Sequence, residues 1–251
     1  MKIAPSRENA EAVADTILLA FDPENNMLPY LDRVAKMFPE IPSLVHPEMG
    51  RETILSTVEE LIGREKQANR QQIEEQLRHF QELAQGVLSE GVAELLEMFQ
   101  LWDPAPLRFT CWLGLYNPFP RSVLKKEYFL HYDVSDQVFL RASLHEINHM
   151  VLFDKWCVLQ GVDCHSEPEF PDTLWYLEEL AVAPTLNDPR IQKIVPVRHS
   201  AYQSLEEILV DGIPLSEQIQ RIYGQGENIP GFLREAYDFL VKNGISKSSA
   251  Q

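Results

Sequence analysis

Apolar residues recur at helical spacing through most of the chain. Between residues 51 and 102 they form amphipathic stripes, one that ends near Gly63 and others that run past Gly86 and Gly91. Stripes of this kind usually form the faces on which helices pack against one another. The same spacing predicts further helices at residues 6–21, 27–38, 135–159, 172–187, 205–210, 215–223 and 232–241.

Two short segments in the middle of the chain have the composition and alternation of β-strands. Residues 109–116 and 126–134 are rich in aromatic and other β-prone residues, and a proline-rich turn at 117–120 separates them. We predict that they form a small mixed sheet directly before the helix at 135–159. The fold class is therefore α+β, mostly α, with a helical N-terminal half.

The amino-acid composition changes at residues 103–106, the sequence Asp-Pro-Ala-Pro, and we expect a domain boundary there. It divides the chain into a helical N-terminal subdomain at 1–102, a core at 103–200 that contains the predicted sheet, and a helical C-terminal region at 201–251. The polar residues at the end of the chain are expected to form a frayed tail.

The chain is strongly acidic, which narrows the classes of partner. Its 251 residues carry a formal net charge of −16. Such a surface repels phosphate backbones and anionic lipids, so we expect no nucleic-acid binding and no membrane binding. No segment approaches the roughly twenty apolar residues of a membrane span. The chain has only three cysteines, which is an odd number and too few for a framework of disulfide bonds. This cysteine content is typical of a reducing compartment, and we therefore expect a cytoplasmic protein.

The most informative stretch is His145-Glu146-Ile147-Asn148-His149. Two histidines four positions apart lie on one face of a helix, so both imidazoles can reach a single metal ion. A glutamate directly after the first histidine lies beside the open position of that metal, where it can accept a proton from water. This H-E-x-x-H pattern is typical of zinc metallopeptidases.

A catalytic zinc site needs a third protein ligand, and two adjacent glutamates on the next predicted helix are the candidates. Glu178 and Glu179 both fall among the apolar residues of the stretch 174–183. A carboxylate buried among such residues costs several kcal/mol unless it is paired, hydrogen-bonded or bound to a metal. We therefore expect one of the two to bind the ion.

The surroundings of these residues resemble the gluzincin metallopeptidases, the broad thermolysin-like clan. Residues 142–151 match the extended H-E-x-x-H pattern, with uncharged residues around the histidines, and residues 177–181 are similar to the Glu-x-x-Ala element that supplies the third ligand. The likeness covers roughly residues 109–183. It lacks the Gly-x-Met-Glu-Asn signature of the aminopeptidase branch, so exopeptidase specificity is not implied.

The resemblance implies a zincin-like core whose small sheet packs on the helix of the motif. It implies a zinc ion held by His145, His149 and Glu178, with Glu179 as the alternative third ligand. It also implies that Glu146 is the general base that activates water for attack on a peptide bond of a peptide or protein substrate.

Two residues that follow the third ligand are candidates for the donor that stabilises the oxyanion. They are His199 and Tyr202, and an isolated residue of either type more often has a structural role.

Other interpretations remain open. Cys157, Cys164 and His165 could bind a second metal, but they lack a C-x-x-C spacing and a fourth ligand. A non-catalytic helical interaction protein that keeps the metal site also fits the pattern, and so does a metal-free helical protein with a chance match.

Overall fold

The computed structural model describes most of the chain, namely residues 1–6, 9–22, 32, 34–36, 38–101, 108–116 and 121–245. The predicted helix at 27–38 and the predicted frayed tail lie largely outside these residues. The predicted boundary at 103–106 and the predicted turn at 117–120 lie wholly outside them.

The fold is α+β and mostly helical, as predicted. The helices are α1 (Ala10–Phe21), α3 (Ile41–Leu44), α4 (Arg51–Ala68), α5 (Arg70–Gln85), α6 (Val87–Met98), α7 (Asp136–Gln160), α8 (Thr173–Leu186), α9 (Pro189–Ile194), α10 (Gln203–Glu206), α11 (Leu215–Gln225) and α12 (Ile229–Lys242). The strands are β1 (Lys2–Pro5), β2 (Thr110–Gly114), β3 (Arg121–Ser122), β4 (Glu127–His131), β5 (Leu209–Val210) and β6 (Ile213–Pro214).

Four strands form one mixed sheet in the order β1-β2-β4-β3. The pairs β1–β2 and β2–β4 are parallel, whereas the short β3 runs antiparallel to β4 at the edge of the sheet. β2 and β4 are the two predicted strands. β1 is a correction to the prediction, because the chain enters the sheet before the first helix, which begins at Ala10 and not at residue 6.

The N-terminal part of the chain is built onto the sheet and the central helix. β1 lies beside β2 although about a hundred residues separate them, and the backbone N–H of Ile3 donates a hydrogen bond to Gln81 of α5. α5 contacts β1 and β2, and α6 contacts α7. The sheet therefore draws residues from both sides of the predicted boundary at 102.

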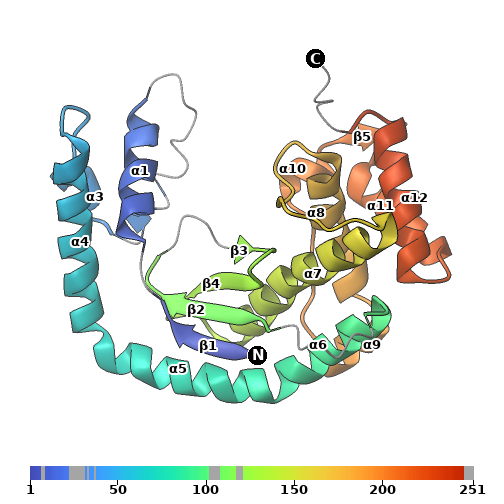
Figure 1. Ribbon diagram of the computed structural model, residues 1–251, viewed down its shortest axis with the longest axis horizontal. Coiled ribbons are helices and arrows are strands. Elements are labelled where there is room, and N and C mark those ends of the chain that lie inside the picture. Colours follow the sequence, from blue (N-terminus) through green and yellow to red (C-terminus); the bar gives the residue numbers. More distant parts are fainter. Residues whose placement is uncertain are drawn as a thin grey trace.

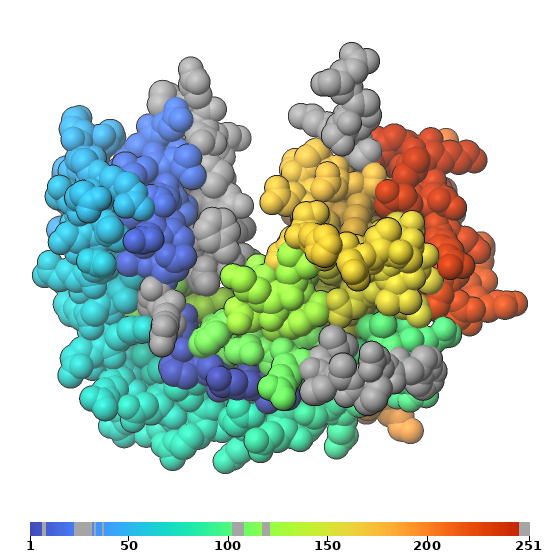
Figure 2. Space-filling model, viewed as in Figure 1, coloured from blue at the N-terminus to red at the C-terminus, as the bar shows by residue number. Residues whose placement is uncertain are grey.

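The elements are arranged as an open U (Figure 1). α5 runs along the base beneath the sheet, α1, α3 and α4 form one side, and α8, α10, α11 and α12 form the other. In the space-filling view the surface is hollowed between the two sides (Figure 2). α7 runs from the sheet into the second side, so its middle turns lie near the floor of this hollow.

α7 is the central element of the core. Its N-terminus is capped by the side chain of Ser135, which accepts from the backbone N–H of Val138, and it ends at Gly161, whose φ of 65° gives a left-handed C-cap. Buried residues occur on several faces of the helix, and it contacts α6, α8 and β4. A helix enclosed in this way holds its side chains in fixed positions, which a metal site requires.

Two further helix predictions need correction. The helix predicted to stop near Gly63 continues to Ala68, because one glycine costs a helix interior only about 1 kcal/mol. The helix predicted at 205–210 is replaced by the short α10 and by β5, which pairs with β6 across a turn at Asp211 and Gly212. Both of these turn residues have positive φ.

The cysteines also differ from expectation. Cys157 and Cys164 form a disulfide that joins the last turns of α7 to the loop that follows it, and Cys111 is a buried free thiol. Disulfides are rare in reducing compartments, so this bond speaks against the reasoning that led to a cytoplasmic protein. Among the described residues, none of the helices has the length and apolar character needed to cross a membrane.

Candidate metal centre

The two histidines of the motif lie one turn apart on α7 and face each other. Their Nε2 atoms are 3.0 Å apart, and their ring centroids are 4.7 Å apart. Oε2 of Glu179, which comes from α8, lies 3.8 Å from Nε2 of His145 and 3.6 Å from Nε2 of His149. In the described part of the chain, these three residues form the one group of His, Cys, Asp and Glu side chains with metal-binding geometry.

The spacing of the three donor atoms fits a tetrahedral zinc ion. Ligands about 2.0–2.1 Å from such an ion lie about 3.3 Å from one another, and the three observed distances run from 3.0 to 3.8 Å. Oε2 of Glu179 is buried and accepts no hydrogen bond. A buried carboxylate oxygen without a partner is costly, and a cation at this point would satisfy it.

Of the two glutamates that the sequence left as alternatives, the structure brings Glu179 and not Glu178 to the Nε2 atoms. Glu178 lies on the other side of His149, with its Oε2 4.0 Å from Nδ1 of that ring. Adjacent positions on a helix point about 100° apart, so α8 can place one carboxylate at the donor cluster and the other behind it. The geometry thus favours Glu179 as the third ligand, contrary to the preference for Glu178 drawn from the sequence.

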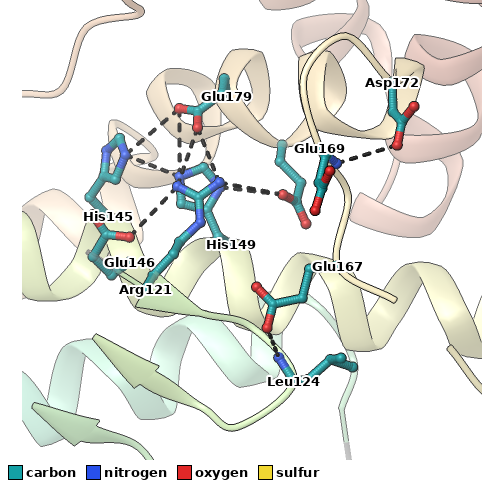
Figure 3. Close-up of polar contacts among 10 residues, drawn as sticks. Arg121, Leu124, His145, Glu146, His149, Glu167, Glu169, Asp172 and Glu179 are labelled. Atoms are coloured by element: carbon teal, nitrogen blue, oxygen red, sulfur yellow. Dashed lines mark hydrogen bonds and ion pairs between the residues drawn. The ribbon is translucent and has the colours of Figure 1, made fainter. Parts of the chain in front are cut away.

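Arg121 is a residue of the site that the sequence analysis missed. It lies on β3, its side chain is 17% exposed, and both of its terminal nitrogens are 3.2 Å from Oε1 of Glu179. The same guanidinium lies 3.7 Å from Oε2 of Glu146 and 3.7 Å from Oε2 of Glu178. It therefore sits among three carboxylates that come from two helices, as Figure 3 shows for Glu146 and Glu179.

The charges of the cluster also fit a divalent cation. Three ionised glutamates against one arginine leave two negative charges in a buried site. Without a metal, burial raises the pKa of Glu178 to about 8 and that of Glu146 to about 7, and it also raises the pKa of Glu179. These groups therefore tend to hold protons where a cation is missing.

The environment of both histidines favours the neutral imidazole, which is the form that binds a metal. Burial, reinforced by the charge of Arg121, lowers the pKa of His145 to about 3 and that of His149 well below its ordinary value. Metal ligation requires the unprotonated imidazole, which is the form that these environments favour. His149 is fully buried, whereas the His145 side chain is 20% exposed, so the cluster opens to solvent on the His145 side.

Glu146 lies beside the cluster without belonging to it. Its side chain is 15% exposed, its Oε2 has no hydrogen bond, and the nearest cation is Arg121. This is the position expected of a base that accepts a proton from water next to a metal.

The structure also brings both candidate oxyanion donors to the exposed side of the site. The rings of His199 and Tyr202 have their centroids 6.5 Å and 6.4 Å from that of His145. The His199 backbone is held by Asn187, which donates to its carbonyl at 2.8 Å and accepts from its N–H at 2.9 Å. Nε2 of His199 is buried and has no hydrogen-bond partner.

The alternative cysteine site does not form. The sulfur atoms of Cys157 and Cys164 are bonded to each other, so neither is available as a thiolate ligand beside His165.

Comparisons with known proteins add no assignment to this geometry. No protein-family model, no curated protein and no solved structure matches the chain, so the likeness to the gluzincin clan remains a prediction from the motif.

Proposed function

We propose that this protein is a zinc-dependent peptidase whose metal is held by His145, His149 and Glu179. The observation that carries the proposal is the convergence of two Nε2 atoms and one carboxylate oxygen, all within 4.8 Å of one another, with Glu146 beside them. Support comes from the order of elements as well. A strand of the small sheet contacts the motif helix, and a second helix supplies the acidic ligand, as a zincin-like core requires.

The zinc ion would supply two kinds of chemistry, since it lowers the pKa of water to about 7 and polarises a carbonyl group. Glu146 accepts the proton of the attacking water and passes it to the leaving amine nitrogen, which is the role of a general base and then of a general acid. The substrate reaches the site from the His145 side, where the cluster is partly exposed to solvent.

The experiment that tests this function separates chemistry from metal binding. Glu146→Gln should abolish hydrolysis of a peptide library while the protein still binds about one zinc ion per chain, because Glu146 touches the water and not the metal. Glu169→Gln removes an exposed carboxylate from the loop before α8 and should leave both hydrolysis and zinc content unchanged.

Two outcomes would overturn the proposal. Hydrolysis that survives in Glu146→Gln would show that another group is the base. A wild-type protein that binds zinc without hydrolysing any peptide would favour the non-catalytic interaction protein instead.

A further inference from the structure

The guanidinium of Arg121 donates hydrogen bonds to one carboxylate oxygen of Glu179, the proposed third ligand. The other oxygen of this carboxylate faces the two histidines. Both terminal nitrogens of the guanidinium lie 3.2 Å from Oε1 of Glu179, while Oε2 of the same carboxylate faces the two Nε2 atoms. A carboxylate held in this way can offer one oxygen to a metal but not two. The contact thus defines the orientation of Glu179 before any metal binds.

Arg121 is itself held in place by the loop before α8. The hydroxyl of Ser122 donates to Oε1 of Glu167 at 2.5 Å. The backbone N–H of Leu124 donates to the same oxygen at 3.3 Å, as Figure 3 shows. Ser122 also accepts from the backbone N–H of Lys125. β3 has only two residues, and these bonds fix the short segment that carries Arg121.

We propose that Arg121 is a positioning residue that holds Glu179 as a one-oxygen metal ligand and keeps Glu146 beside the metal. The inference rests on the proposed metal centre and deepens it. The ion pairs of Arg121 in the described site are with the carboxylates of Glu146, Glu178 and Glu179, so it acts on the metal through these glutamates.

If Arg121 acted on the site only through its positive charge, its removal would change metal affinity in the opposite direction from the loss of a positioning residue. Removing a positive charge next to a divalent cation strengthens binding of that cation, because the repulsion between them disappears. Removing a group that orients a ligand weakens binding, typically by about 10–100-fold. The sign of the change therefore separates the two roles.

The experiment measures the zinc Kd of the full chain by competition with a chromophoric chelator. Arg121→Met should raise the Kd by about 10–100-fold, and Arg121→Lys should raise it by at least about 5-fold, because an ammonium keeps the charge but not the planar fork. Arg141→Met is the matched control. Arg141 is an exposed cation one turn before His145 that holds neither glutamate, and its removal should leave the Kd within about twofold or tighten it.

A second readout reports the geometry directly. X-ray absorption at the zinc edge should show four light ligands in the wild type and an additional oxygen in Arg121→Lys, because the freed Glu179 can then bind through both oxygens. If Arg121→Met does not fold, as judged by circular dichroism and thermal unfolding, Arg121→Lys decides alone.

An unchanged Kd in Arg121→Lys, or a tighter Kd in Arg121→Met, would overturn the positioning role and leave the proposed function standing. A wild-type protein that binds no zinc would overturn the proposed function itself.

Discussion

Nδ1 of His149 lies 4.0 Å from Oε2 of Glu178, and both groups are fully buried. Neither atom has a hydrogen-bond partner among the described side chains, and the same Oε2 of Glu178 lies 3.7 Å from the guanidinium of Arg121. A carboxylate that accepts a hydrogen bond from the second ring nitrogen of a metal-binding histidine orients the ring and raises its basicity. Glu178 lies on the side of the His149 ring where such a carboxylate would stand, but at 4.0 Å it makes no hydrogen bond to Nδ1 in this structure. The two adjacent glutamates of α8 thus have different relations to the same imidazole.

This division of roles predicts unequal effects of substitution. Glu179→Gln removes the proposed third ligand and should weaken zinc binding by more than about 100-fold, whereas Glu178→Gln removes the carboxylate beside His149 and should weaken it by about 10–100-fold. The zinc Kd from chelator competition measures both. A larger loss of zinc affinity in Glu178→Gln than in Glu179→Gln would identify Glu178, the residue that the sequence favoured, as the third ligand.

Much of the site follows from local sequence because its spacing is helical. A separation of four positions places His145 and His149 on one face wherever the helix lies, and Glu146 follows from the same motif. The choice between Glu178 and Glu179 does not follow, since both are buried and only the rotation of α8 against α7 decides which one reaches the histidines.

Arg121 could not be found from the sequence at all. It lies on a two-residue strand next to the proline-rich segment, and nothing in its neighbourhood marks it as buried. Its place in the site is set by pairing of β3 with β4 and by the contact of Ser122 with Glu167, a residue 45 positions away.

In the fold as well, the elements set by local sequence are predicted and those set by tertiary contacts are missed. The helices α11 and α12 are predicted because their amphipathic periodicity is strong. The helices α7 and α8 are buried on several faces and are predicted from the cap candidates and breakers at their ends. β1 is missed because it has four residues and its partner strand follows more than a hundred positions later. Short strands of this kind are determined by tertiary contacts and not by local preference.

Two glycines in helix interiors should respond to alanine in different ways. A Cβ at Gly63 of α4 would meet no atom within 4 Å, so Gly63→Ala should raise the free energy of unfolding by about 0.5–1 kcal/mol. A Cβ at Gly91 of α6 would lie 3.1 Å from Val195 and 3.5 Å from Leu144, the residue before His145. Crowding of this kind costs about 1–3 kcal/mol, so Gly91→Ala should be less stable than Gly63→Ala by about that amount.

Urea unfolding of both variants measures the difference. Equal stabilisation by the two alanines would show that α6 can move away from α7 without loss, and that the close approach at Gly91 is not needed to hold the motif helix.

Asp188, the N-cap of α9, should contribute stability that depends on pH. Burial of its carboxyl acts to raise the pKa, but hydrogen bonds from Arg190 and Tyr223 outweigh it, and the net pKa is lowered. A carboxyl whose pKa is lower in the folded state stabilises the protein above its ordinary pKa of about 3.9, and this stability is lost as the pH falls through the lowered value.

Asp188→Asn should therefore lower the free energy of unfolding at pH 7 by about 1–3 kcal/mol, and the difference from the wild type should shrink below about pH 4. Asp238→Asn, at an exposed position of α12, should change stability by less than about 0.5 kcal/mol at pH 7. A deficit in Asp188→Asn that stays constant down to pH 3 would assign its effect to lost packing and not to charge.

His199 and Tyr202 lie at similar distances from His145, but the structure favours His199 as the oxyanion donor of the proposed peptidase. Its backbone is fixed by two hydrogen bonds to Asn187, and burial lowers its pKa to about 4, so it is a neutral imidazole at pH 7 that can donate from one nitrogen. Tyr202 is 51% exposed at the start of the short α10. A donor fixed in advance contributes more to catalysis than one that must be ordered during the reaction.

With a peptide that the wild type hydrolyses, His199→Phe should lower kcat by about 100-fold with little change in KM, because an oxyanion contact forms only in the transition state. Tyr202→Phe, which keeps the ring and removes only the hydroxyl, should lower kcat by less than about 5-fold. The zinc Kd of both variants should match the wild type, since neither residue belongs to the donor cluster. A large kcat loss in Tyr202→Phe alone would transfer the donor role to the tyrosine, and a rise in the zinc Kd of His199→Phe would show that His199 supports the metal centre and not the transition state.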